Sequence, residues 1–268
     1  MTDCELFSRQ LAPGVYQISD ALHGPNTDGY SFAPGKATAN SYLVNGKEKA
    51  ALIDQAVNSS ELYGFAQRLA GKPLTLFLTH GHPDHVFGLD KVGEGWLHPA
   101  DHRMIREGIT GISAPVHNVK LHPLEDRQLI DLGERTLQVL HLPGHTPGSV
   151  LFHDKQSGIL FVGDTCARRL LYGVTPTIPL SEHCKKLKKL MNEDFNVMYS
   201  AHDRCPLDKE YIRTILRCIE TMLPQSKETV MIPGLGFMRN LRYGKEDTLE
   251  FFDLAIMEQY MNWGARDD

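Results

Sequence analysis

A cluster of metal-binding residue types lies between Thr79 and His85, in the sequence Thr-His-Gly-His-Pro-Asp-His. A mostly apolar run, Leu74 to Leu78, follows Pro73 and predicts a buried strand that ends where the cluster begins. A strand end is rigid, and a metal site needs ligands that are held rigidly. The alternatives are a polar loop with unrelated histidines, or a structural zinc site, which would usually recruit cysteines.

Three more metal-capable side chains follow predicted strands in the same way. They are His145 after residues 135–141, Asp164 after residues 158–162 and His202 after residues 196–199. Taken alone, each has another explanation: a loop histidine, a helix cap or a surface histidine. Strand ends that gather on one edge of a sandwich would bring these side chains to the Thr79–His85 cluster.

Two aspartates beside these positions are expected to support the ligands. Asp54 ends the predicted strand 50–53, and it is either a ligand or a hydrogen-bond acceptor for the turn after Leu78. We favour the second role, in which Asp54 orients the backbone or a ligand imidazole. Asp203 follows His202 and is expected to support it or to lie on the surface.

The complete set predicts a dinuclear metal site. The expected ligands are His80, His82 and His145 for one ion, Asp84, His85 and His202 for the other, and Asp164 as the bridge. Five imidazoles and two carboxylates carry a charge of about −2 against about +4 on two divalent ions, which lowers the pKa of a bound water towards about 7. Because the set contains no thiolate, hydrolysis is expected rather than a closed structural site.

Composition and charge narrow the class of protein. The chain has 268 residues, is 41% hydrophobic and carries a net charge of −5 without a long basic block, which argues against nucleic-acid binding. Five cysteines without a CxxC pair predict reduced thiols in the cytoplasm. The N-terminus shows no secretory signal, and no apolar run reaches membrane-spanning length, so we expect no membrane association.

The pattern of apolar residues predicts an α/β layered sandwich of one domain, residues 1–268, with residues 206–268 as a C-terminal extension. Expected strands cover residues 14–18, 40–44, 50–53, 74–78, 95–98, 128–132, 135–141, 150–152, 158–162 and 196–199. Expected helices cover residues 59–70, capped by Ser59, then 100–107, 180–191 and 206–223. Residues 229–263 are expected to mix strands with a final helix from about Asp247. The strands form two groups, each broken by helices, which predicts two sheets packed face to face with helices outside.

Several residues are candidates for contact with a substrate. The loop 21–38 is long, so it is either a lip over the site or a solvated loop, and it contains His23. Tyr172, on the loop expected after Asp164, is either a catalytic group that reaches a substrate oxygen or a packed tyrosine. His183 is assigned a structural role together with other histidines: His98, His102, His117, His122, His141 and His153.

These motifs resemble the metallo-β-lactamase superfamily. The matching segments are Thr79 to His85, Pro143 to Ser149, Gly163-Asp164-Thr165 and Ala201-His202, and Asp54 stands at the family's early aspartate. The resemblance implies a four-layer αββα sandwich of two mixed β-sheets flanked by helices. It also implies two divalent ions, Zn²⁺ first and iron or manganese as alternatives.

Within the superfamily, the sequence is most similar to the glyoxalase II-like and lactonase-like hydrolases, which keep a bridging aspartate where Asp164 stands. β-Lactamases lack this bridge and are usually secreted. Diiron reductases usually carry a carboxylate where His82 stands and add a flavodoxin domain. The chain departs from glyoxalase II in residues 165–172, which lack the usual Cys-Gly-Arg stretch, and in a tail without a basic glutathione-binding pattern.

The resemblance therefore predicts a dinuclear hydrolase in which a bridging hydroxide attacks an ester, thioester or lactone of a small molecule. Asp84 is expected to relay a proton as well as to bind metal. The alternatives are a phosphodiesterase, a single-iron oxidoreductase resembling persulfide dioxygenases, and a non-catalytic binding module. Residues 206–268 are expected to line the pocket or to form a homodimer interface.

Overall fold

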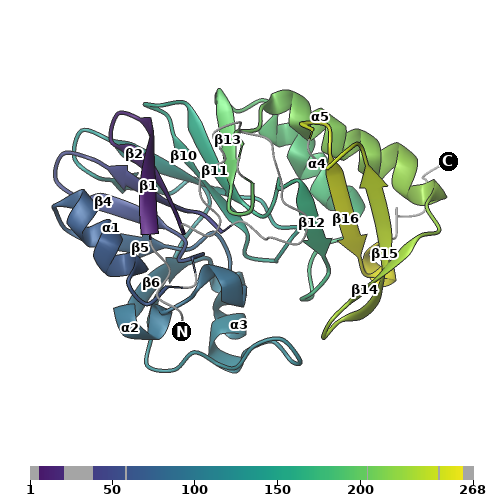
Figure 1. Ribbon diagram of the computed structural model, residues 1–268, viewed down its shortest axis with the longest axis horizontal. Coiled ribbons are helices and arrows are strands. Elements are labelled where there is room, and N and C mark those ends of the chain that lie inside the picture. Colours follow the sequence, from purple (N-terminus) through teal and green to yellow (C-terminus); the bar gives the residue numbers. More distant parts are fainter. Residues whose placement is uncertain (1–5, 21–38, 58, 204, 247, 262–268) are drawn as a thin grey trace.

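Two β-sheets pack face to face at the centre of the molecule, and helices cover their outer faces (Figure 1). The computed structural model describes residues 6–20, 39–57, 59–203, 205–246 and 248–261. The first sheet has its strands in chain order: β1 Leu6–Ala12, β2 Val15–Asp20, β3 Ser41–Asn45, β4 Ala50–Ile53, β5 Leu74–Phe77, β6 Glu94–Leu97 and β7 Lys120–Pro123. Strands β1 to β4 are antiparallel, whereas β4 to β7 are parallel.

The second sheet has the order β13–β11–β10–β9–β8. Its strands are β8 Leu129–Asp131, β9 Thr136–His141, β10 Val150–Asp154, β11 Ile159–Gly163 and β13 Val197–Ser200. Its strands pair antiparallel except β11 and β13, which are parallel. The described helices are α1 Leu62–Ala70, α2 Leu89–Val92, α3 His102–Glu107, α4 Leu180–Leu190 and α5 Lys209–Arg217. No described helix is both long and apolar enough to span a bilayer.

Alternation along the strands separates the layers. In β3, Tyr42 and Val44 pack with Phe152 of β10 between the two sheets, whereas Leu43 packs on the outer side with Leu62 of α1. The outer face of the second sheet packs against α4 and α5 in the same way. The central strands β3, β4, β10 and β11 therefore bury both faces. This fixes their register, because a slip of one residue would exchange the two faces. The predicted αββα sandwich is confirmed.

Strand ends gather on one edge of this sandwich. Val150 N donates to the Thr79 carbonyl at 2.8 Å, which joins the start of β10 to the end of β5 across the two sheets. Ala201 N donates to the Gly163 carbonyl at 3.1 Å, which joins the ends of β13 and β11. The segments that carry the candidate ligands are thus hydrogen-bonded to one another by their backbones.

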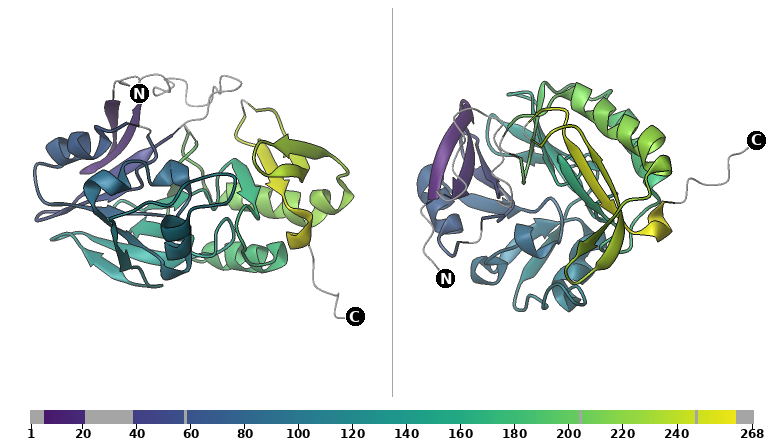
Figure 2. Two further views of the ribbon diagram at one scale, coloured as in Figure 1. Left: turned by 90° about the horizontal axis from the view of Figure 1, so that it is seen from below. Right: turned by 45° about the vertical axis from the view of Figure 1, so that its right-hand side comes forward.

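A third sheet lies beside α5 (Figures 1 and 2). Strands were expected among residues 229–263, but a separate sheet was not. Its order is β12 Arg169–Tyr172, β16 Phe252–Ile256, β15 Gly236–Tyr243 and β14 Thr229–Ile232. Because β12 pairs with β16, the chain directly after Asp164 is hydrogen-bonded to the C-terminal segment.

Four local features differ from the prediction. The helix expected from Asp247 is strand β16 followed by a 3-10 turn at Glu258–Tyr260. The helix expected over residues 206–223 ends at Arg217 and continues as a π-helical turn and a 3-10 turn. The helix expected from Ser59 begins at Leu62, and Ser59 Oγ accepts from Glu61 N instead of capping it. Strands β1, β7 and β12 were not predicted.

Candidate metal centre

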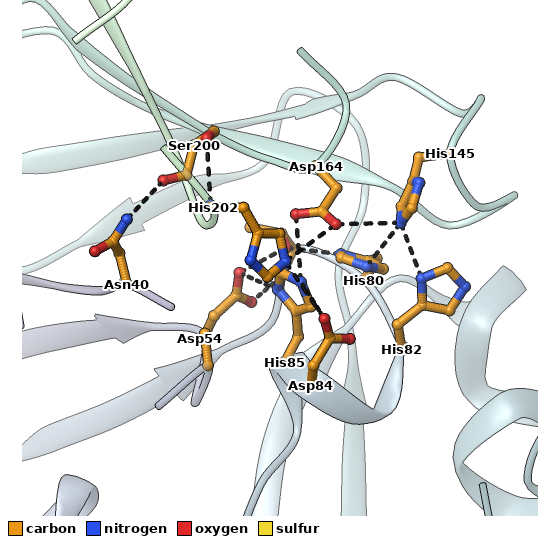
Figure 3. Close-up of polar contacts among 12 residues, drawn as sticks. Asn40, Asp54, His80, His82, Asp84, His85, His145, Asp164, Ser200 and His202 are labelled. Atoms are coloured by element: carbon orange, nitrogen blue, oxygen red, sulfur yellow. Dashed lines mark hydrogen bonds and ion pairs between the residues drawn. The ribbon is translucent and has the colours of Figure 1, made fainter. Parts of the chain in front are cut away.

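Three imidazoles from two loops converge on one point: His80, His82 and His145 (Figure 3). His145 Nε2 lies 3.2 Å from His80 Nε2 and 2.9 Å from His82 Nδ1. The other ring nitrogen of His145, Nδ1, donates to the Leu171 carbonyl at 2.7 Å, so Nε2 is left to present a lone pair. Nitrogens this close can share one ion, since Zn–N bonds are about 2.0–2.1 Å long.

The second group consists of Asp84, His85 and His202, and Asp164 lies between the two groups (Figure 3). His202 Nε2 is 3.3 Å from Asp84 Oδ2 and 3.3 Å from Asp164 Oδ2. Asp164 Oδ1 is 3.3 Å from His85 Nε2, and its Oδ2 is 3.6 Å from His145 Nε2. Asp164 thus faces both groups, as a bridging carboxylate must.

The polar atoms at this point fit two divalent cations. His85 Nε2 and Asp164 Oδ1 are buried, face each other at 3.3 Å without the geometry of a hydrogen bond, and both point into the cluster. Buried polar groups are normally satisfied, so such atoms need a specific explanation. Imidazole and carboxylate donors without a thiolate suit zinc, iron or manganese. The structure brings together all seven predicted ligands, and their binding of metal stays a prediction.

The three histidines of the first group have lowered pKa values. Burial, followed by repulsion from the neighbouring imidazoles, lowers the pKa of His80 well below its usual value. Burial and the neighbouring His145 lower the pKa of His82 to about 3, and burial also lowers the pKa of His145. These three rings are therefore neutral at pH 7, which is the form that binds metal.

The second group is charged when no cation is bound. Burial opposes the charge on His85, but nearby carboxylates, Asp164 first, outweigh it and raise its pKa to about 10. The same balance raises the pKa of His202 well above its usual value. Burial alone would raise the pKa of Asp84, but His85 and His202 hold it below its usual range.

Asp54 orients the metal-binding turn, as predicted. Its Oδ1 accepts from Thr79 N and its Oδ2 accepts from Thr79 Oγ1, both at 2.7 Å. Its Oδ2 also accepts from His85 Nδ1 at 2.9 Å, which turns His85 Nε2 towards Asp164. Asp54 has a φ of 60°, a left-handed conformation that costs a residue with a side chain about 1–2 kcal/mol. This backbone strain occurs at the residue whose carboxylate orients His85.

A network of buried polar groups fixes the turn that carries His202. Tyr42 Oη donates to the Ser200 carbonyl at 2.6 Å, and Asn40 Nδ2 donates to the Asp203 carbonyl at 2.8 Å. Asn40 Nδ2 also lies 3.4 Å from the Ser200 carbonyl (Figure 3). Ser200 Oγ donates to Asp203 Oδ2 at 2.5 Å. Asp203 therefore supports the turn, which was one of the two roles expected for it. Asn40 was not singled out by the sequence.

His183 limits the space beside His145. It is fully buried, its Nδ1 lies 3.2 Å from the Pro143 carbonyl, and it packs against the backbone of Gly144. A Cβ on Gly144 would lie 2.0 Å from His183 Nδ1 and 2.5 Å from its Cε1. Glycine is therefore required directly before His145 by close approach.

Gly144→Ala is expected to reduce the free energy of unfolding by about 1–3 kcal/mol, because the new methyl group must displace a buried ring. Gly64→Ala is the control, since Gly64 lies inside α1 with only Arg68 Nη1 within 4 Å of the new Cβ. That substitution should stabilise by about 0.5–1 kcal/mol through helix propensity. Urea unfolding of both metal-free variants measures the difference. Equal stability of the two variants would contradict the packing role of His183.

The structure places Tyr172 in the core and not at the ligand cluster. Its side chain is fully buried, and its hydroxyl donates to the Ile178 carbonyl at 2.8 Å. The catalytic role suggested for Tyr172 is therefore replaced by the alternative, a packed tyrosine. The loop 21–38 with His23 lies outside the described residues.

Two cavities lie beside α3, and each reaches one of the loops that carry the ligands. One, of about 510 Å³, is lined by Gly81, Pro83 and apolar side chains that include Phe87 and Met104. The other, of about 480 Å³, also touches Met104 and reaches Pro147 in the loop of His145. Charged and polar side chains also line the cavities, Asp90 and His117 in the first and Arg103 and Glu107 in the second, and spaces of this size are typical of small-molecule sites.

Comparisons with known proteins agree with this geometry. Acyl-coenzyme A thioesterase MBLAC2 of Homo sapiens is 30% identical over 221 residues, which is 69% of this chain and 76% of that protein. Hydroxyacylglutathione hydrolase of Legionella pneumophila (strain Lens) is 29% identical over 208 residues, 75% of this chain and 77% of that protein. A solved structure, TTHA1623 in a di-iron-bound form, is 27% identical with a TM-score of 0.52, covering 68% of this chain and 96% of that one.

The model of one protein family matches residues 34–181, more than half of the chain. The matched segment contains Asp54, the Thr79–His85 cluster, His145 and Asp164. The chain belongs to the metallo-beta-lactamase superfamily.

Proposed function

We propose that this protein is a dinuclear metallo-hydrolase that cleaves an ester, thioester or lactone of a small molecule. The observation that carries the proposal is the juxtaposition of two ligand groups that share the carboxylate of Asp164. A single-iron oxidoreductase with the same motif would use one group, so the number of bound ions separates the two functions. Two bound divalent ions would supply Lewis acidity and an ionised water as nucleophile.

The residues of the two groups would have different roles in binding metal and in transferring protons. His80, His82 and His145 would hold the first ion as neutral ligands, and Asp164 would bridge to the second. Asp84 Oδ2 lies 3.3 Å from His202 Nε2, and its side chain is 49% exposed. A carboxylate at the open side of the site can accept the proton of the attacking water and deliver it to the leaving group.

Thioesters are the substrate class to test first. Two relatives are named for hydrolysis of an acyl-coenzyme A and of a hydroxyacylglutathione. Met104, which lines the cavities beside Gly81 and Pro147, and Phe87, which lines the first of them, would pack against an acyl chain. Residues 165–172 and the tail differ from glyoxalase II, so a glutathione conjugate is the less favoured acyl donor.

The metal and the compartment are part of the proposal. Zn²⁺ is the expected ion, and iron and manganese are alternatives with the same donor preference. A cytoplasmic location is supported by the four cysteines in the described residues, which are free and buried.

The test is elemental analysis of the purified protein, followed by a panel of esters, thioesters, lactones and phosphodiesters. We expect two ions per chain and turnover of a thioester that is lost with chelation. One iron per chain with thiol-dependent oxygen uptake would replace the proposal with the oxidoreductase. A metal-loaded protein that is inert on every class would favour a binding module.

A further inference from the structure

Asp101 connects the two loops that carry the first group of ligands. Its Oδ2 accepts from Gly81 N at 3.0 Å and from Thr146 Oγ1 at 2.7 Å. Its Oδ1 accepts from Gly148 N at 2.6 Å. The side chain is fully buried at the start of α3, and it forms no capping hydrogen bond to its own helix. All the hydrogen bonds of this carboxylate are therefore directed at the two loops.

These loops determine the geometry of the first ion. Gly81 lies between His80 and His82, and Thr146 directly follows His145. A Cβ on Gly148 would lie 2.5 Å from Asp101 Oδ1, so the backbone of this loop lies so close to the carboxylate that only glycine fits there. The distance between the His80–His82 pair and His145 thus depends on how both loops sit on Asp101.

We propose that Asp101 is a positioning residue for the first metal ion: its carboxylate fixes the loop of His80 and His82 against the loop of His145. This inference rests on the ligand set proposed above. Asp101 does not touch a ligand ring, and it acts through the backbone on either side of the ligands.

The contacts require a carboxylate at this position. The two backbone N–H groups approach different oxygens, so both side-chain positions must accept. An amide has one accepting oxygen, and in either orientation its NH₂ group would face a backbone N–H. Thr146 alone could adapt, because a hydroxyl can donate or accept.

A general stabilising role explains Asp101 poorly. No cationic side chain of the described residues forms an ion pair with it, and burial raises its pKa to about 6. A buried charge without a cation is costly to keep. The protein keeps this carboxylate where its acceptors join the metal-binding loops.

The test is Asp101→Asn, with Asp154→Asn as the matched control. Asp154 is a buried carboxylate at the far end of β10 that accepts from Arg135 Nη2 at 2.8 Å. Metal affinity is measured by competition with a chromogenic chelator. Exchange of the Gly81 and Gly148 amides is measured by NMR on the metal-free proteins, which separates the effect from catalysis.

We expect Asp101→Asn to weaken binding of the first Zn²⁺ by about 10–100-fold, the usual effect of losing a group that orients ligands. Exchange at Gly81 or Gly148 should accelerate about 10-fold or more through local opening. Asp154→Asn should lower the melting temperature and leave zinc affinity and both amides unchanged. The absorption spectrum of the Co²⁺-substituted protein should change only in Asp101→Asn.

Unchanged zinc affinity and amide exchange in Asp101→Asn would overturn the inference, and so would an equal loss of zinc in Asp154→Asn. If Asp101→Asn does not fold, Thr146→Val removes one of the three contacts and keeps both backbone donors. Zinc binding should be measurably weaker in that variant, by less than about 10-fold. A zinc affinity equal to that of the wild type would contradict the positioning role of Asp101. If the wild-type protein binds two ions and Asp101→Asn binds them with the same affinity, this inference alone is refuted. If the wild-type protein binds no ion, the proposed function and the inference are refuted together.

Discussion

Asp164→Asn should reduce the rate of hydrolysis by more than about 100-fold, beyond the 10–100-fold typical of residues that only orient ligands. Asp164 faces both ligand groups, with Oδ2 3.6 Å from His145 Nε2 and Oδ1 3.3 Å from His85 Nε2. An amide keeps the volume but loses the charge and one accepting oxygen, so it cannot bridge two cations. The variant should therefore hold fewer than two ions per chain.

The measurement is metal content by elemental analysis together with kcat/KM on the best substrate. Asp208→Asn is the control, because the Asp208 side chain accepts from Tyr211 N as the cap of α5 and asparagine caps equally well. The control should keep its metals and its activity. An Asp164→Asn protein with two ions and normal turnover would show that Asp164 does not bridge.

The ligand set could be predicted from the sequence because each ligand follows an apolar segment. Such a segment forms a strand whose end is fixed by its own residues, and the ends of β5, β11 and β13 meet at one edge of the sandwich. Asp54 was predictable for the same reason, since it directly ends β4. The candidate metal ligands can therefore be recognised from short stretches of the sequence.

Asp101 could not be recognised in this way. Its partners Gly81, Thr146 and Gly148 lie 20, 45 and 47 residues away in the chain. An aspartate at the start of a helix is ordinarily explained as a cap, and nothing local distinguishes the two uses.

The third sheet was missed because long-range pairing decided it. Residues 247–260 have helical spacing in Leu249, Phe252 and Ile256, yet β16 pairs with β12 and β15 on either side. Tertiary pairing overrides a weak local preference. The same pairing buries Tyr172 in β12, which the sequence alone left on a loop.

Removal of both ions should lower the melting temperature by about 10 °C or more. Each ion present at 100 times its Kd contributes about 2.7 kcal/mol to the folded state, and two contribute about 5 kcal/mol. For a chain of this size, 1 kcal/mol corresponds to about 2–4 °C. Calorimetry with and without chelator at pH 7.5 measures the difference. A shift of less than about 2 °C at saturating zinc would show that the ligand groups hold no ion tightly.

The two ions should differ in their dependence on pH. The pKa of His82 is about 3, and the pKa values of His80 and His145 are also lowered, so the first ion binds neutral rings without displacing protons near pH 7. His85, with a pKa of about 10, is protonated there, and the pKa of His202 is likewise raised. The second ion must displace those protons, so its affinity should rise as the pH increases from 6 towards 10.

Calorimetric titration of the metal-free protein in two buffers of different ionisation enthalpy counts these protons. We expect release of about three protons with the second ion, two from His85 and His202 and one from the water that the two ions would ionise, and close to none with the first. The gap in melting temperature between the metal-bound and metal-free forms should widen with pH for the same reason, because bound metal stabilises in proportion to its affinity. Equal proton release in both steps would mean that the carboxylates around His85 and His202 do not hold these rings in their charged form.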